Sequence, residues 1–266
     1  MRFTAPSALR AAEQGHMDAL RNLRSQGCEW PHDHYTCCTA AANNGDLEMM
    51  KWLRQADCAW GHGILSGAVA SGNLQLVQWL LQQGVEFEED KMTAAARRGH
   101  LSVCKFLLSA ECPWGEDTAD ATAAANQPDT LRWLMQSACP WEAEAVCEHS
   151  AMGGAVEVLM LLRELHCLMD LNDLGQTAAA YGHTQILDYC AQQGATWSAG
   201  ELDDMIQGCA IDGFLDVVQW LRQHGAAWPR ELGWSDDGGI DRWHADVLAW
   251  AREQGCTSPE VRQLQG

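Results

Sequence analysis

Positive charge and long apolar runs are both scarce in this sequence. Lys and Arg together number 17 against 36 Asp and Glu, so the formal net charge is −19. Sequence-independent binding to nucleic acid or to an anionic membrane surface requires dense positive charge. The sequence therefore predicts no nucleic-acid or membrane partner and favours basic partners. No apolar stretch approaches the roughly 20 residues of a membrane-spanning helix, and the initial MRFTAPSALRAAEQGH lacks the apolar core of a secretory signal.

Known catalytic and nucleotide-binding motifs are absent as well. The sequence has no Gly-x-Ser-x-Gly elbow, His-Glu-x-x-His pair, phosphate loop or dinucleotide fingerprint. The run Asp236–Gly239 lacks the spaced ligands and closing Glu of a calcium loop, and predicts a turn. We therefore expect a non-enzymatic protein without a cofactor. An enzyme whose motif is not recognisable is the less favoured alternative.

A degenerate repeat runs through most of the chain. The stretch Ala95–Trp114, AARRGHLSVCKFLLSAECPW, aligns with Ala11–Trp30 and with Ala42–Trp60. Each copy has a hinge residue between two amphipathic pieces, and the hinges are Gly15, Gly45, Gly72, Gly99, Asn126, Gly154, Gly182, Gly213 and Trp243. Repeats of this length stack into solenoids, whose core grows in one dimension. We therefore predict one all-α domain over residues 1–266, built from about nine helix–turn–helix repeats.

The apolar spacing around each hinge predicts two helices. Leucines recur eight residues after most hinges, as in Leu53, Leu107 and Leu221, and aromatic residues recur seven after. A left-handed cap twelve after the hinge is expected to end this second helix, with Gly at five positions and Asp57, Glu111, Ala138 and His166 at the other four. The first helix has Ala pairs, and its N-caps are predicted nine before the hinge, at Thr36, Asp90, Asp117, Asp173 and Asp204.

Cysteine follows the same register. Twelve cysteines without a secretory signal predict free thiols in a reducing compartment, the cytoplasm or nucleus. Six of them lie thirteen residues after a hinge, where Val85, Ala195 and Ala226 also occur. A column that accepts Cys, Val and Ala indicates a small buried apolar group. The cluster Cys28, His32, His34, Cys37 and Cys38 does not have a usual zinc spacing, and we predict no metal site. A metal- or thiol-responsive regulator remains the alternative function.

Tryptophan forms a further column, fifteen residues after the hinge. It contains Trp30, Trp60, Trp114, Trp141, Trp197 and Trp228, with Phe87 and Met169 as replacements. A regular aromatic row most often seals the joint between neighbouring repeats. A stacking platform for nucleic-acid bases is the alternative, which the acidic charge disfavours. Four histidines directly follow a hinge, where the ring is expected to bind backbone groups.

These columns resemble the ankyrin repeat. The resemblance rests on Ala95-Ala96, Gly99-His100-Leu101, Leu107-Leu108 and the Cys112-Pro113-Trp114 turn, and it covers about residues 5–256. It is greatest to the short Cys- and Trp-rich repeats of protist and giant-virus proteins. The repeats here are shorter than the usual 33 residues and lack the Thr-Pro-Leu-His signature. The resemblance therefore implies an ankyrin-like stack with shortened fingers and little or no β-strand.

The resemblance also implies a function, which is binding another protein on the concave face formed by connector tips and first helices. Positions one, two and ten before each hinge supply the predicted partner-binding residues: Glu13, Gln14, Tyr35, Asn43, Asn44, His62, Ser71, Glu89, Arg97, Arg98, Glu116, Glu144, Asn172, Tyr181, Asp203 and Asp212. Glu89, Glu116 and Glu144 precede the predicted caps and indicate an acidic lip for a basic segment. The alternative is that the acidic residues only cap helices. We expect a monomer.

Overall fold

The computed structural model describes residues 5–28, 30, 36–61, 63–87, 90–115, 117–228 and 245–256. These residues form helices, and no strand occurs among them, as the sequence predicts. Contacts divide the chain into two compact units, Met1–Thr122 with Asp129–Pro140, and Ala123–Pro128 with Trp141–Gly266. The prediction of a single domain stays a prediction.

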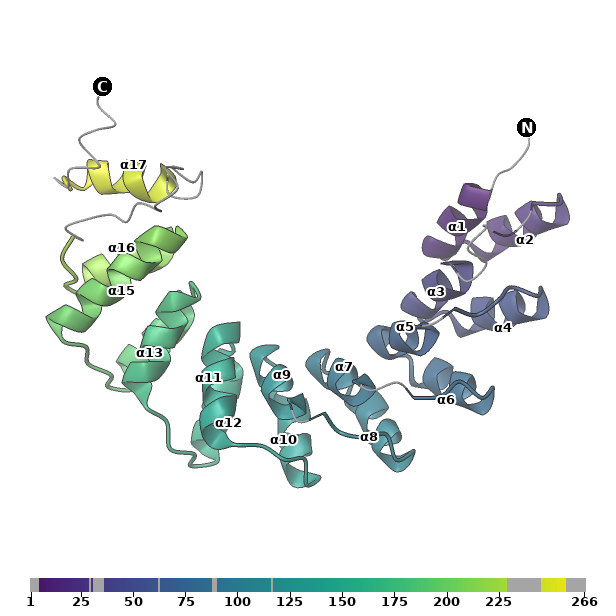
Figure 1. Ribbon diagram of the computed structural model, residues 1–266, viewed down its shortest axis with the longest axis horizontal. Helices are drawn as coiled ribbons and strands as arrows, with labels where there is room; N and C mark the ends of the chain where they lie inside the picture. The colour runs from purple at the N-terminus through teal and green to yellow at the C-terminus, as the bar shows by residue number, and fades with distance from the viewer. Residues whose placement is uncertain are drawn as a thin grey trace. The chain divides into compact units, whose positions relative to one another are not determined.

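The first compact unit contains five helix pairs (Figure 1). Their bounds are α1 (Ala5–Glu13), α2 (Met17–Ser25), α3 (Thr36–Asn43), α4 (Leu47–Gln55), α5 (Ile64–Ser71), α6 (Leu74–Gln82), α7 (Lys91–Arg97), α8 (Leu101–Ser109), α9 (Thr118–Ala124) and α10 (Pro128–Gln136). The last two residues of α9 and the first of α10 are assigned to the second unit. The odd-numbered first helices α1, α3, α5 and α7 contact one another in succession, and each contacts the second helix of its own repeat.

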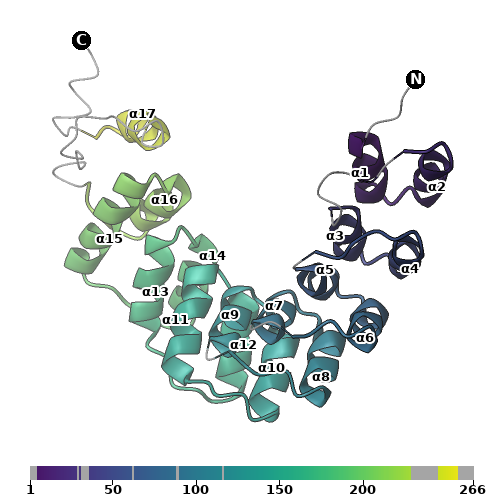
Figure 2. The same ribbon diagram turned by 45° about the vertical axis from the view of Figure 1, so that its right-hand side comes forward.

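The second compact unit repeats this arrangement. Its helices are α11 (Ala143–Gly153), α12 (Val156–Glu164), α13 (Leu171–Ala180), α14 (Thr184–Gln192), α15 (Ala199–Asp212), α16 (Leu215–Gln223) and α17 (Ala245–Glu253). The first helices α11, α13 and α15 form one row, and α12, α14, α16 and α17 form the other (Figure 2). The two rows are the helix–turn–helix stack that the spacing predicts.

Left-handed backbone at the hinges turns the chain between the two helices of a repeat. The described hinge residues from Gly15 to Gly213 all have positive φ, including Asn126 at 53°. Gly in this region carries no steric cost, whereas other residues do. The predicted caps at the ends of second helices are also confirmed, because Asp57, Glu111, Ala138 and His166 all have φ between 55° and 63°.

Two of the five predicted N-caps are wrong. Asp90 and Asp117 directly precede α7 and α9 as predicted, and Thr36 is the first residue of α3. Helices α13 and α15 begin earlier than the Ala pattern indicates, so Asp173 and Asp204 lie inside them. The capping side chains are Asp170, which accepts hydrogen bonds from two backbone amides, and Ser198, which forms a capping box with Glu201. Asp90 does precede α7, but its side chain makes no cap bond and pairs instead with Lys91 Nζ at 2.7 Å.

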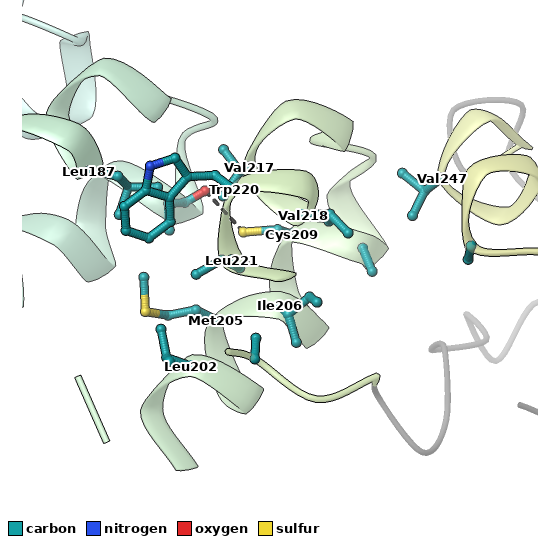
Figure 3. Close-up of a cluster of buried hydrophobic side chains, with 14 of the residues drawn as sticks. Leu187, Leu202, Met205, Ile206, Cys209, Val217, Val218, Trp220, Leu221 and Val247 are labelled. Atoms are coloured by element: carbon teal, nitrogen blue, oxygen red, sulfur yellow. Dashed lines mark hydrogen bonds between the residues drawn. The ribbon is translucent and has the colours of Figure 1, made fainter. Parts of the chain in front are cut away.

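The core lies between the two helix rows within each compact unit. In the second unit, Ile206 and Cys209 of α15 pack among Val217, Val218 and Leu221 of α16 (Figure 3). The Cys209 thiol donates to the Ala179 carbonyl oxygen of the preceding first helix at 3.2 Å. Small residues such as Ala178 and Ala179 let neighbouring first helices approach closely, and both are buried. The stack therefore leaves the remaining first-helix positions and the connectors for contact with other molecules.

Candidate partner-binding surface

In three repeats, the side chain directly after the hinge bonds to the backbone of the repeat before it. His100 Nε2 lies 3.0 Å from the Ala70 carbonyl oxygen, and His183 Nε2 lies 2.9 Å from that of Met152. Asn73 donates to the Gly45 carbonyl oxygen at 2.7 Å in the equivalent place. The prediction that these histidines satisfy backbone groups is confirmed for His100 and His183. His244 and the last hinge, Trp243, lie outside the described residues.

The tryptophan column joins successive repeats, as predicted. Each Trp fifteen after a hinge pairs with the Trp seven after the next hinge wherever both are present and described, with ring centroids 5.4–6.0 Å apart. The pairs are Trp30–Trp52, Trp60–Trp79, Trp114–Trp133, Trp197–Trp220 and Trp228–Trp250. Arginines cover three of these indoles, with Arg54 Cζ 4.4 Å from the Trp60 ring centroid. Trp141 has no such partner, because the next repeat has Leu161 seven after its hinge, and Trp141 is 36% exposed.

Most of the cysteines are buried, and burial raises the pKa of several of their thiols. In the column thirteen after the hinge, Cys28, Cys58, Cys112, Cys139 and Cys256 are buried, whereas Cys167 is half-buried. Desolvation raises the pKa of Cys139 to about 11, with a further contribution from Asp120. Desolvation likewise raises the pKa values of Cys104 and Cys209 to about 12. None of the twelve cysteines, all of which lie in the described part of the chain, forms a disulfide bond.

The cysteines near the start of the chain interact with one another. The hydrogen bond with Cys58 and burial both raise the pKa of the Cys38 thiol. Desolvation by burial raises the pKa of Cys37 to about 12. The other members of the zinc alternative, His32 and His34, lie outside the described residues. Within the described part of the chain, no group of three His, Cys, Asp or Glu side chains could hold a metal ion.

Most described members of the predicted surface are exposed, but four predicted residues cannot be placed. The exposed members are Glu13, Gln14, Asn43, Asn44, Arg97, Arg98, Glu144, Tyr181 and Asp212. Ser71, Asn172 and Asp203 are half-buried. Tyr35, His62, Glu89 and Glu116 lie outside the described residues. Of the predicted acidic lip, only Glu144 can be examined.

Two residues of the column ten before the hinge make internal hydrogen bonds. Asn172 Oδ1 accepts from the Thr196 amide at 3.1 Å, and Asp203 Oδ1 accepts from the Ala227 amide at 2.7 Å. In both repeats, the first helix therefore holds the connector that follows its own second helix. These bonds give Asn172 and Asp203 a structural role, and their predicted part in partner binding remains a prediction.

Glu144 occupies the same column and lines a groove instead. The groove lies between α11, α13 and the connector before α13, and its volume is about 700 Å³. Four carboxylates line it: Glu144, Glu148, Asp170 and Asp173. The apolar part comes from Leu168 and Met169 of the connector, with Cys147 and Leu174 on the helices. Desolvation raises the pKa of the Cys147 thiol to about 11, so this group is neutral at physiological pH.

The sequence prediction found only part of this groove. Glu148 follows Glu144 by one helical turn, a spacing that places both on one helix face and that the sequence prediction does not use. Leu168 is a large apolar residue, and its side chain is 94% exposed. The equivalent positions of other repeats hold small or polar residues such as Ala59, Pro113 and Thr196. The departure of Leu168 from a column of small and polar residues is the signal that could have identified the groove.

A smaller groove in the first compact unit brings together three predicted residues. Glu13, Asn43 and Asn44 line a space of about 310 Å³ between α1 and α3. Asn44 Nδ2 donates to the carbonyl oxygens of Ala12 and Glu13, at 3.1 and 2.9 Å. This groove has one carboxylate and no cluster of like charge. It therefore has less electrostatic preference for a ligand than the groove between α11 and α13.

Comparison with known proteins agrees with the repeat geometry. A family model of ankyrin repeats in three copies matches residues 8–91 and 65–145, which together make up just over half of the chain. No curated protein matches the sequence. Among the described helices, none combines the length and apolar character needed to cross a membrane. Ankyrin repeats generally mediate protein–protein interaction and are typically non-catalytic. The chain belongs to the ankyrin repeat family.

Proposed function

We propose that the chain is a non-catalytic interaction module that binds a basic segment of another protein along its first helices and connectors. One contrast carries the proposal. The columns that pack repeats together are mostly buried or half-buried and chemically similar, whereas positions one and two before the hinges are mostly exposed and differ between repeats. Asn43, Arg98 and Tyr181, for example, present an amide, a cation and a phenol. A surface that varies on a constant scaffold is suited to one particular partner.

Charge supports a basic partner. The net charge of −19 attracts cationic segments over distances comparable to the Debye length, about 8 Å at physiological salt. The groove between α11 and α13 supplies four carboxylates and no basic side chain. Electrostatic complementarity of this kind increases association rates and selects partners by sign of charge.

A charge-reversal experiment tests the proposal. We expect the change of Glu89, Glu116 and Glu144 to Lys to weaken binding of a fluorescent lysine-rich peptide at least tenfold and to reduce its dependence on salt. The matched control changes Glu111, Glu164 and Glu253 to Lys, at the ends of second helices, where positive charge suits the helix dipole. Equal losses in both variants would show that net charge alone attracts the peptide, and unchanged binding in the first variant would reject the acidic lip.

Metal- or thiol-responsive regulation remains the alternative function. The half-buried Cys167 and the interacting pair Cys38 and Cys58 are the thiols that bear on it. Binding of the lysine-rich peptide should be the same in reduced protein and in protein treated with a mild oxidant or with zinc. A change of tenfold or more on oxidation or zinc addition would favour the alternative.

A further inference from the structure

The repeat hinged at Gly154 departs from most other repeats at two columns, and both departures meet Glu144 in the groove between α11 and α13. Ten before the hinge stands Glu144, as Glu89 and Glu116 do in the two preceding repeats, whereas the next two repeats have Asn172 and Asp203. Fourteen after stands Leu168, and fifteen after stands Met169 where most repeats have Trp. The groove therefore follows from these particular side chains and is not a general property of the stack.

The next repeat shows what normally fills this space. Trp197 lies against α13, where its Nε1 donates to the Asn172 carbonyl oxygen at 3.1 Å. A Cβ placed on Gly175 would lie only 2.2 Å from the Trp197 ring, so the indole rests directly on the helix. The equivalent positions on α11 are Glu144 and Cys147, and both line the groove together with Met169. The shorter, flexible Met169 leaves open a space that an indole occupies one repeat later.

The connector is also held differently. In the next two repeats, Asn172 and Asp203 bind the backbone amide of the residue fourteen after the hinge. No such bond from Glu144 to Leu168 is present in this described part of the chain. The Glu144 carboxylate is exposed, and the Leu168 side chain is almost completely exposed beside it. A large apolar side chain at the rim of an acidic groove gives a ligand two different kinds of contact.

Two of the carboxylates repel each other within the fold. Glu144 and Glu148 lie one turn apart on α11, and like charges at this spacing destabilise a helix. Neither forms an ion pair with a described residue of the chain. Asp170 by contrast caps α13 through two backbone amides, so its presence has a structural reason. Glu144 and Glu148, together with Asp173, are therefore the carboxylates available to a cationic ligand.

We infer that this groove binds a basic protein segment that carries one large apolar side chain. The apolar side chain enters the space beside Met169 and packs on Leu168, while flanking Lys or Arg side chains pair with Glu144 and Glu148. This inference rests on the proposed function and specifies the chemistry of the partner at one place. Charge complementarity decides the occupant, since a neutral or acidic segment would leave the like-charged pair uncompensated.

Two conservative variants test the inference with a pair of peptides. The first peptide has four lysines around one phenylalanine, and its twin has alanine in place of the phenylalanine. Met169→Trp restores the side chain of six other repeats, and Leu168→Thr introduces the residue found at Thr196. In the repeat hinged at Gly45, Trp60 occurs together with Cys38, and Cys38 stands at the position equivalent to Cys147. An indole and a thiol are therefore compatible at these two positions of a repeat. Both variants should fold, which urea unfolding would verify.

The intact chain should bind the phenylalanine peptide about tenfold more tightly than its twin. Each variant should reduce that preference below twofold and leave the affinity for the alanine twin unchanged. Leu165→Thr is the control, because Leu165 is exposed at the end of α12 and does not line the groove. Equal affinity for both peptides, or a preference that survives both variants, would overturn the inference while the proposed function stands. Failure of the intact chain to bind either peptide would reject the proposed function and the inference with it.

Discussion

Gly153, near the end of α11, lies so close to the preceding first helix that a larger residue cannot be accommodated. A Cβ at this position would lie 2.0 Å from the Ala124 carbonyl oxygen, which is a backbone atom and cannot move aside easily. Ala124 and Gly153 belong to the same compact unit. The close approach of the backbone at Gly153 to that at Ala124 therefore requires that residue 153 has no Cβ.

We predict that Gly153→Ala lowers the free energy of unfolding by about 1–3 kcal/mol, the usual range for overpacking. Gly208 in α15 is the matched control, because a Cβ there would meet nothing within 4 Å. Gly208→Ala should raise stability by about 0.5–1 kcal/mol through helix propensity. Urea unfolding of both variants measures the difference, and equal effects would contradict the assigned contact.

The buried thiols make stability depend on pH. Burial raises the pKa of Cys104 to about 12 and that of Cys190 to about 11, against an ordinary value near 9. Between about pH 9 and 11 the unfolded chain loses thiol protons that the folded chain retains. Since the unfolded state then binds fewer protons, the free energy of unfolding falls as pH rises.

The variant Cys104→Val/Cys190→Ala should therefore lose less stability between pH 8 and pH 10 than the natural chain. Both replacements occur in the same columns of other repeats, at Val77 and Ala251. Urea midpoints at the two pH values provide the test. An identical pH dependence in both proteins would show that these thiols do not remain protonated in the fold.

Single columns were predictable to different extents. The cysteine and tryptophan columns could be assigned from the residues they contain, because a column of small apolar or of mostly aromatic groups has few physical interpretations. The exposure of Cys167 and of Trp141 could not be assigned in this way, since each depends on what the neighbouring repeat places opposite it. Hydrogen bonds such as that from the Ala227 amide to Asp203 depend on backbone position and have no signature in the sequence.

At the scale of helices, the ends of second helices were predictable, whereas the starts of first helices were predictable for α3, α7 and α9 but not for α13 and α15. A left-handed cap imposes one backbone conformation, so Gly recurs there at a fixed distance. Helix starts accept Ser, Asp or Thr at several offsets, and the longer α13 and α15 took earlier residues, Asp170 and Ser198, as their caps. Asp173 and Asp204 are therefore of a residue type that caps helices, but they lie inside α13 and α15.

Ala138 offers a direct test of the left-handed caps. Its φ is 63°, a conformation that costs an L-residue roughly 1–2 kcal/mol. Ala138→Gly should raise the free energy of unfolding by about 0.5–1 kcal/mol, because the relief of strain exceeds the added flexibility of the unfolded chain.

The reverse change, Gly84→Ala, should lower stability by a similar amount. Gly84 has φ of 84° in the same column, and a Cβ there would meet nothing within 4 Å. Any loss on substitution must therefore come from the backbone conformation and not from a steric clash. Opposite signs of the two changes in urea unfolding are the expected result; a loss of stability in Ala138→Gly would contradict the cap assignment.

At the scale of the whole molecule, the proposed function assigns packing to some columns and partner binding to others. Nearest-neighbour packing stabilises a repeat stack, so only the packing columns must remain uniform. In the proposed function, the other positions vary with the partner. The proposal of a cationic ligand rests on the acidic balance of the chain, which the sequence gives, and on the groove between α11 and α13, which only the structure gives.

The most direct test of the proposed function is to map where a basic peptide lies on the intact chain. The lysine-rich peptide would carry a photoreactive benzophenone in place of its phenylalanine, and cross-linked residues would be identified by mass spectrometry. We expect cross-links on first helices and connectors, foremost at Glu144–Glu148 and Leu168–Leu174, and their loss at high salt. Cross-links concentrated on the second helices α12, α14 and α16, or no more than an acidic control peptide gives, would contradict the proposed function.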